Sequence, residues 1–205
     1  MKTIYTIALV LILPLFAEAS PPKVIKIEAW SIQGDNGLSL PQTIRLFNKA
    51  KARFKHLNIE LKVTRFRRTF NRFYLFNTIE EFEKIHGKWA NWVYWKSPKT
   101  HVKVVILPPL RSNSGLIYFG GAANLCAPDG VAWSNAGMKG FDGSPRFKRS
   151  LRILVHELGH IFGATHDDEH IPNIMMSDIS KVDSVSHLWF SKDSIFSIRN
   201  CLNLF

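Results

Sequence analysis

The sequence predicts a single α/β (α+β) domain with a mixed sheet, and three observations support this fold class. Two segments of alternating apolar residues flank an amphipathic helical segment, which is the order of two parallel strands joined by a helical crossover. A later continuous apolar run is typical of a strand covered on both faces. The chain has 205 residues, of which 46% are hydrophobic, so it can bury one core of ordinary size.

The first half of the chain supplies the crossover unit. Alternation predicts strands over 23–30 and 58–66, and the segment between them, 41–57, predicts a helix. The apolar run 101–107 predicts the covered strand, which two prolines end. Segment 72–100 predicts only a short helix over 78–86, followed by Trp89, Trp92 and Trp95. These tryptophans form either a ligand-facing aromatic patch or a packed excursion from the domain.

The second half supplies an edge strand, a last short strand and two helices. The glycine-containing run 115–122 predicts the edge strand, 131–134 the short strand and 135–143 a loop. Ser144 and Pro145 are suited to the start of a helix whose apolar stripe is Leu151, Leu154, Val155, Leu158 and Phe162. Ser191 is suited to cap a closing helix over 192–202.

The run HELGHIFGATHDD, from His156 to Asp168, has the highest functional specificity in the chain. His156 and His160 are four residues apart, so on a helix they project from one face and can share a metal ion. Glu157 leaves the helix about 100° round from His156, where it can reach a water rather than the metal. Gly163 permits a backbone turn that brings His166 back as a third ligand. Three ligands leave a fourth position for water, as in catalytic zinc sites.

This pattern resembles the metzincin zinc endopeptidases. The resemblance implies a zincin-type catalytic domain over residues 20–205, with a twisted sheet of about five strands, an antiparallel edge strand, an active-site helix, a methionine turn and a C-terminal helix. It implies one catalytic Zn²⁺, held by three histidines, with Glu157 as general base. Nothing in the sequence indicates an organic cofactor or decides whether structural calcium is present. Two simpler interpretations remain: the histidines are core residues, or the zinc site is inert.

The resemblance also assigns roles to other residues. Met175 is expected to form the methionine turn below the metal, with Met176 as the second choice, and Asp167 is expected to support the site from behind. Asp167 directly after the third histidine looks adamalysin-like (reprolysin-like), whereas the nine-residue interval from His166 to Met175 is closer to the matrixins. The edge strand would pair with an extended substrate; its residues are Gly115, Leu116, Ile117, Tyr118, Phe119 and Gly120. Apolar Ile179, Val182 and Val185 would wall the pocket just after the cut.

The N-terminal residues predict export. Lys2, an apolar run over 4–16 and the small-x-small sequence Ala17-Glu18-Ala19 form the pattern of a secretory signal over residues 1–19, cleaved after Ala19. The alternative is an uncleaved anchor, although the run is too short for a stable membrane span. We therefore expect a secreted protein, extracellular or periplasmic, without an attached prodomain.

Export makes the two cysteines interpretable. In an oxidising compartment Cys126 and Cys201 are expected to pair, and the adamalysin resemblance supports this disulfide; two free buried thiols are the alternative. The bond would stabilise the fold by about 4 kcal/mol in the chain-entropy model.

Positive charge is concentrated in one region. The formal net charge is +11, and residues 42–72 hold ten Lys or Arg and one acid. Such a surface would attract an anionic surface or a polyanion, or it is only a solvated helix face. We expect a monomeric zinc-dependent endopeptidase acting on peptides or proteins, without nucleic acid as a partner. The alternative is a secreted polyanion- or partner-binding protein on the same scaffold, with weak catalysis or none.

Overall fold

The computed structural model describes residues 21–33, 38–70, 78–108, 110–111, 113–114, 117–118, 121–127, 129–134, 144–169, 173–177 and 189–204. Several sequence predictions concern residues outside these ranges: the signal segment 1–19, the loop 135–143, and the pocket wall of Ile179, Val182 and Val185. In the described part, no helix is long and apolar enough to cross a bilayer.

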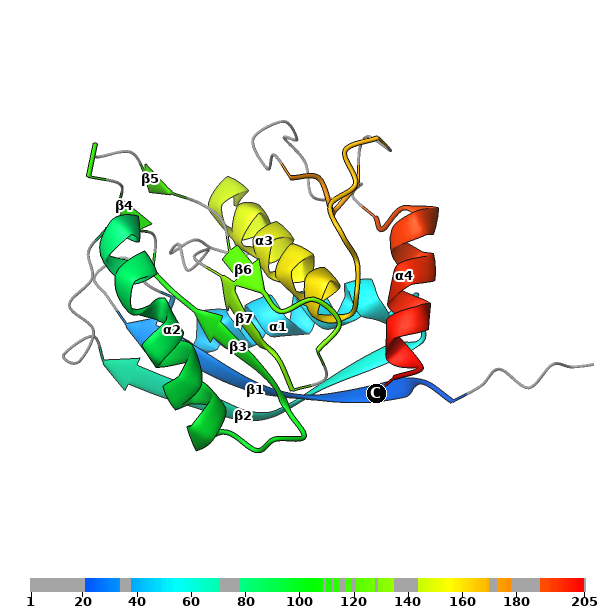
Figure 1. The fold of residues 1–205 in the computed structure, drawn as a ribbon, viewed down its shortest axis with the longest axis horizontal. Helices are drawn as coiled ribbons and strands as arrows, with labels where there is room; N and C mark the ends of the chain where they lie inside the picture. The colour runs from blue at the N-terminus through cyan, green and yellow to red at the C-terminus, as the bar shows by residue number, and fades with distance from the viewer. Residues whose placement is uncertain are drawn as a thin grey trace, which may run out of the picture.

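A five-stranded sheet forms the centre of the domain, in the order β2-β1-β3-β7-β6. Its strands are β1 (Lys23–Gln33), β2 (Ile59–Phe70), β3 (Val102–Ile106), β7 (Val131–Ser134) and β6 (Gly121–Ala123). The first four in this order run parallel, and β6 pairs antiparallel with β7 at one edge (Figure 1). The predicted parallel pair of β1 and β2 is confirmed, with helix α1 (Leu40–Lys55) as its crossover.

Local sequence explains where α1 begins. The Ser39 hydroxyl accepts a hydrogen bond from the Gln42 amide, and the Gln42 side chain accepts one from the Ser39 amide, which is a capping box. A proline stands in the first turn, where its missing N–H is not needed. The buried face of α1 carries Leu46, Phe47, Ala50 and Phe54.

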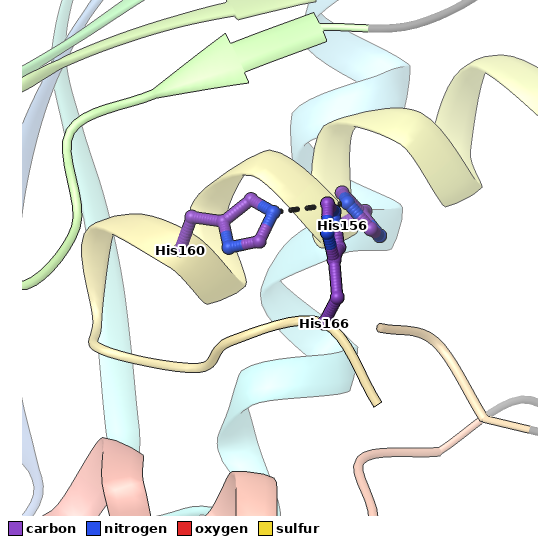
Figure 2. Close-up of side chains that lie close together, drawn as sticks. All are labelled: His156, His160 and His166. Atoms are coloured by element: carbon purple, nitrogen blue, oxygen red, sulfur yellow. Dashed lines mark hydrogen bonds between the residues drawn. The ribbon is translucent and has the colours of Figure 1, made fainter. Parts of the chain in front are cut away.

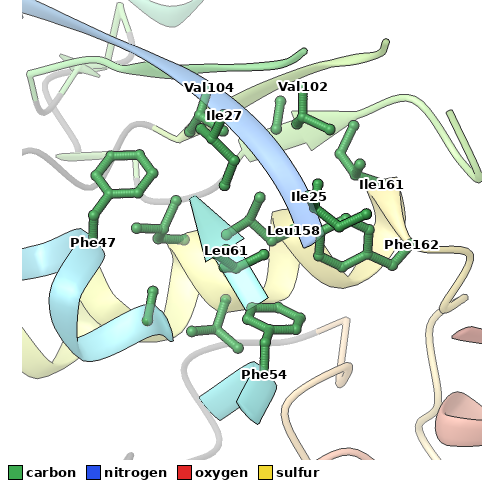
Figure 3. Packing of buried hydrophobic residues seen from close by; sticks show 14 of the residues in the cluster. Ile25, Ile27, Phe47, Phe54, Leu61, Val102, Val104, Leu158, Ile161 and Phe162 are labelled. Atoms are coloured by element: carbon green, nitrogen blue, oxygen red, sulfur yellow. The ribbon is translucent and has the colours of Figure 1, made fainter. Parts of the chain in front are cut away.

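The main core lies between one face of the sheet and the helices α1 and α3 (Pro145–Ile161) (Figure 3). Ile25 and Ile27 of β1 point into it, as do Val102 and Val104 of β3, because side chains along a strand alternate between faces. Phe54 contacts Phe162 edge to face, with ring centroids 5.2 Å apart. The helix that bears the HELGH sequence therefore rests directly on the sheet.

The opposite face of the sheet is covered by α2 (Ile79–Lys96). Thr78 caps this helix, as its predicted start implies, but the helix continues far past the predicted end at residue 86. A glycine such as Gly87 makes a helix about 1 kcal/mol less stable than an alanine would. Burial of Phe82 and Val93 against the sheet offsets this cost. The three tryptophans consequently lie on α2 rather than in a loop. Trp95 is 77% exposed, and the other two side chains fall outside the described ones.

The antiparallel edge strand is present, but its position differs from the predicted 115–122. The edge is β6, and Ile117 and Tyr118 instead form β5 (Ile117–Tyr118), which pairs with β4 (Leu110–Arg111) in a separate two-stranded sheet. Of the residues expected along the substrate, Gly115, Leu116, Phe119 and Gly120 lie outside the described ones. Short apolar runs interrupted by glycine do not fix a register, so which part of this run joins the main sheet is set by packing.

A C-terminal helix, α4 (Lys192–Leu202), closes the domain and begins at the predicted cap, Ser191. It stands beside the end of α3, at the right of Figure 1. The predicted disulfide between Cys126 and Cys201 is present and joins α4 to the segment after β6.

Candidate metal centre

Helix α3 supplies two of the three histidines. The Ser144 hydroxyl caps its start by accepting from the Phe147 amide at 3.2 Å. The predicted apolar stripe is buried, which fixes the rotation of the helix about its axis. Because of that rotation, His156 and His160 project together on another side of α3, as their four-residue spacing predicts.

The end of α3 directs the chain back toward the histidines. Gly163 has φ +96°, a conformation that favours glycine, and a Cβ built there would lie 2.6 Å from the Cys201 Cβ. The amides of Cys126 and Ala127 donate to the carbonyls of His160 and Ile161, each at 3.0 Å. These bonds satisfy carbonyls that a helix end leaves open. The disulfide thus fixes the position at which α3 ends.

The three histidine rings converge (Figure 2). One ligand nitrogen from each of His156, His160 and His166 can be chosen so that all lie within 4.8 Å of one another. The ring centroid of His166 lies 5.3 Å from that of His156 and 4.9 Å from that of His160. His156 is buried, His160 is half-buried and His166 is exposed, so the group opens toward solvent on the His166 side.

Hydrogen bonds to backbone carbonyls fix the first two rings. Nδ1 of His156 donates to the Ile174 carbonyl at 2.9 Å, and Nδ1 of His160 donates to the Ala164 carbonyl at 2.7 Å. A carbonyl can only accept, so both protons reside on Nδ1 and both Nε2 atoms carry lone pairs. Burial lowers the pKa of His156 to about 4 and also lowers that of His160, which keeps both rings neutral at neutral pH.

This donor set fits a zinc ion. The Nε2 atoms of His156 and His160 face each other at 3.0 Å, and two lone pairs at that distance repel unless a cation lies beside them. Two nitrogen ligands of tetrahedral zinc, each about 2.0–2.1 Å from the metal, are separated by about 3.3 Å. Hydrogen bonds from the far ring nitrogen to carbonyls are also the usual support of zinc-binding histidines.

Glu157 lies between the two helical histidines and is only 3% exposed. Its Oε2 atom is buried and has no hydrogen-bond partner among the described residues. Burial raises the pKa of this carboxyl group to about 8, because the charged form loses its hydration. A buried carboxyl group with an uncommitted oxygen beside a cation site is suited to accept a proton from water, and a bound cation would favour its charged form.

The segment that was predicted to form the methionine turn packs against α3. Met175 is fully buried, and its sulfur would be 2.6 Å from a Cβ built on Gly159, in the turn of helix between His156 and His160. The neighbouring Met176 is also buried, but Met175 is the methionine in contact with Gly159. This segment therefore lies close enough to α3 for the carbonyl of the preceding residue, Ile174, to accept a hydrogen bond from the His156 ring.

Two polar residues that sequence analysis did not single out hold this turn. Asn173 is 2% exposed; its amide donates to the Asp167 carbonyl, and its Oδ1 accepts from the Met175 amide, both at 2.7 Å. The Asp168 carboxylate accepts from the amide and the hydroxyl of Ser177 at 2.8 and 2.7 Å. The contact from Asn173 to an amide two residues on is an Asx turn, a local signal that the sequence did contain.

Asp167 contacts the turn through its backbone. Its amide donates to the Met175 carbonyl at 3.0 Å, and its carbonyl accepts from Asn173. The carboxylate of the next residue, Asp168, also binds the turn. The two segments that carry His166 and Met175 are thus joined by hydrogen bonds in both directions.

Comparisons with known proteins give the fold of this chain. No family model and no curated protein sequence matches it. It is similar to the solved structure of metalloproteinase-II from Bacteroides fragilis, with TM-score 0.57 and 16% identity over 90% of this chain and 55% of that one. It is also similar to the archaemetzincins of Methanopyrus kandleri (TM-score 0.56, 18% identity, 91% of this chain and 99% of that one) and Archaeoglobus fulgidus (0.54, 17%, 84% and 99%).

The chain has the fold of these three solved structures. It spans about half the length of the Bacteroides protein and nearly the full length of the two archaeal ones. These three structures support neither the adamalysin-like branch that Asp167 and the cysteine pair suggested nor the matrixin-like branch that the interval from His166 to Met175 suggested. A single residue, one interval and one cysteine pair do not determine the branch on this scaffold.

Proposed function

We propose that the chain is a zinc-dependent endopeptidase that hydrolyses peptide bonds with an activated water molecule. The observation that carries this proposal is the convergence of His156, His160 and His166, with the first two Nδ1 atoms committed to carbonyls and Glu157 buried beside them. Three protein ligands leave one position of a tetrahedral ion for water, which is the arrangement of catalytic zinc sites. The likeness of the fold to the solved structures of the Bacteroides fragilis metalloproteinase and the Methanopyrus kandleri archaemetzincin supports the same conclusion.

In this mechanism the three histidines would hold the ion, and the fixed Nδ1 protons of His156 and His160 keep the Nε2 lone pairs of these two rings available for it. Zinc supplies a Lewis acid that makes water a nucleophile at neutral pH and polarises the scissile carbonyl. Glu157 accepts a proton from the attacking water, whose oxygen bonds to the carbonyl carbon. Glu157 then gives that proton to the leaving nitrogen as the C–N bond breaks.

Substrate would bind along the sheet edge. β6 is the edge strand next to β7 and lies near α3, with which it makes direct contacts. The outward backbone groups of an edge strand can pair with an extended peptide without regard to its sequence. Within this proposal Ile179, Val182 and Val185 favour an apolar residue just after the cut.

Glu157→Gln tests the mechanism. The variant keeps the size of the side chain but cannot act as a base, so we expect unchanged zinc content and turnover reduced at least about a hundredfold. The measurement is cleavage of a mixed peptide library by the purified protein, with zinc content determined on the same samples. Glu60→Gln, on the exposed part of β2, is the matched control and should remain as active as the unmodified protein.

Chelation separates a zinc peptidase from an inert zinc site. A strong chelator should abolish cleavage, and added zinc should restore it. A Glu157→Gln protein that cleaves the library as fast as Glu60→Gln would remove Glu157 from the mechanism. A zinc-loaded protein that cleaves no peptide in the library would contradict the proposed function as a whole.

Secretion is part of the same proposal. It is supported by the charged start, apolar run and small-residue site within residues 1–19. Mass spectrometry of the protein from its natural source should find an N-terminus at Ser20. Retention of residues 1–19 would show instead that the segment is kept as an anchor.

Polyanion binding is the alternative function, and one observation favours it. α1 contains no acidic residue, and its solvent face carries Arg45, Lys49 and Lys55. Retention on a sulfated matrix should then fall steeply with salt and weaken further when these three residues are changed to Glu. Equal retention of the triple variant would leave α1 as a solvated helix face.

A further inference from the structure

Trp189 lies at the C-terminal end of α1 and is held there by two side chains. The Arg53 guanidinium carbon is 4.9 Å from the centre of the indole ring. The His56 ring meets the same indole edge to face, with centroids 5.0 Å apart. Both residues stand at the end of α1, in its last turn and at its C-cap. The indole is nevertheless 45% exposed, so burial of apolar surface does not fully account for its position.

The backbone of Trp189 is connected to the metal centre by two hydrogen bonds in series. The Ile174 amide donates to the Trp189 carbonyl at 3.1 Å. The Ile174 carbonyl in turn accepts from Nδ1 of His156 at 2.9 Å. One residue, Ile174, therefore joins Trp189 to the first histidine of the site through its amide and its carbonyl. A shift of the Trp189 carbonyl would move or release Ile174, and with it the acceptor that orients the His156 ring.

The next residue anchors the same segment from below. Phe190 is buried against Phe54 of α1, with ring centroids 5.5 Å apart, and it also lies close to Gly159 of α3. Phe190 can hold the chain near the core, but its side chain does not fix the direction in which the preceding carbonyl points. The contacts of Arg53 and His56 with the Trp189 indole restrain the direction of the Trp189 carbonyl.

We propose that Trp189 is a positioning residue for the metal centre. Arg53 and His56 hold its indole, its carbonyl holds Ile174, and Ile174 fixes the ring of His156 so that Nε2 faces the ion. This inference rests on the proposed zinc site, and it applies whether or not the zinc-loaded protein cleaves peptides. It assigns α1 a part in metal binding in addition to its part in the core.

Trp189→Ala is the test, and Trp95→Ala is the matched control because Trp95 is an exposed tryptophan on α2, across the sheet. Loss of a group that orients a metal ligand typically weakens metal affinity about 10–100-fold, and Trp189 acts through one further residue, Ile174, so we expect about tenfold. Zinc affinity is measured by competition with a chromophoric chelator. Trp189→Phe, which keeps a ring for Arg53, should stay within about twofold of the unmodified protein, as should Trp95→Ala.

A second measurement reports the hydrogen bond itself. Amide exchange of Ile174, followed by NMR in the zinc-free protein, should accelerate about tenfold in Trp189→Ala and remain unchanged in Trp95→Ala. Arg53→Gln should accelerate it in the same direction, and Arg53→Lys less so, because lysine retains the charge. A purely structural role would lower the melting temperature without changing the zinc affinity of the folded protein.

The inference is overturned if Trp189→Ala binds zinc as tightly as Trp95→Ala. It is also overturned if Ile174 exchanges equally fast in the two variants. Should Trp189→Ala fail to fold, the comparison of Arg53→Gln with Arg53→Lys decides, because both leave the indole in place. Neither readout requires turnover. If the unmodified protein binds zinc but cleaves no peptide, and Trp189→Ala still weakens zinc binding, only the peptidase proposal is contradicted.

Discussion

Asn173→Ala is expected to loosen the metal centre by removing one buried and one partly buried hydrogen bond. The Asn173 side chain joins the Asp167 carbonyl to the Met175 amide, at 2.7 Å in each case. Met175 is fully buried, so without Asn173 its amide loses a partner that water does not readily replace. A buried donor left unsatisfied costs about 1–3 kcal/mol. The Asp167 carbonyl belongs to a half-buried residue and can recover part of its loss from solvent.

The free energy of unfolding should therefore fall by about 2–3 kcal/mol, as measured by urea denaturation of the zinc-free protein. Zinc affinity should also fall, because Asp167 directly follows His166, the exposed member of the three proposed ligands. Asn173→Asp keeps an acceptor for Met175 but loses the donor to Asp167, so its loss of stability should be intermediate. A loss below about 0.5 kcal/mol in Asn173→Ala would show that these bonds contribute nothing net to folding, and the reasoning would fail.

Three further changes test other parts of the centre. Gly163→Ala places a Cβ 2.6 Å from that of Cys201 at φ +96°, so we expect a loss of at least about 2 kcal/mol and a lower melting temperature; an unchanged melting temperature would contradict the assigned turn. Replacing Cys126 and Cys201 together by Ser should lower the unfolding free energy by about 4 kcal/mol, and a loss under 1 kcal/mol would mean that the disulfide does not restrict the unfolded chain. His166→Ala should bind zinc much more weakly; a stoichiometry still near one at micromolar zinc would exclude His166 as a ligand.

Features that depend on residues close in sequence were predictable. The four-residue spacing of His156 and His160, the caps at Ser144 and Ser191, and the turn at Gly163 all follow from backbone geometry over a few residues. The parallel pairing of the first two strands followed from the helix between them. The predicted end of α2 at residue 86 was wrong because burial of Val93 outweighs the cost of Gly87 inside the helix. Burial depends on the whole fold and cannot be read from nearby residues.

The identity of the supporting groups was decided by the tertiary structure alone. The sequence determined that three imidazoles and one carboxyl group could meet at one ion, since their spacing is that of a helix followed by a glycine turn. It did not determine that the Ile174 carbonyl would orient His156, that the Asp168 carboxylate would bind Ser177, or that β6 would be the edge strand. Each of these contacts joins segments separated along the chain. Helix periodicity repeats over a few residues, whereas the partner of a backbone carbonyl depends on how the whole core packs.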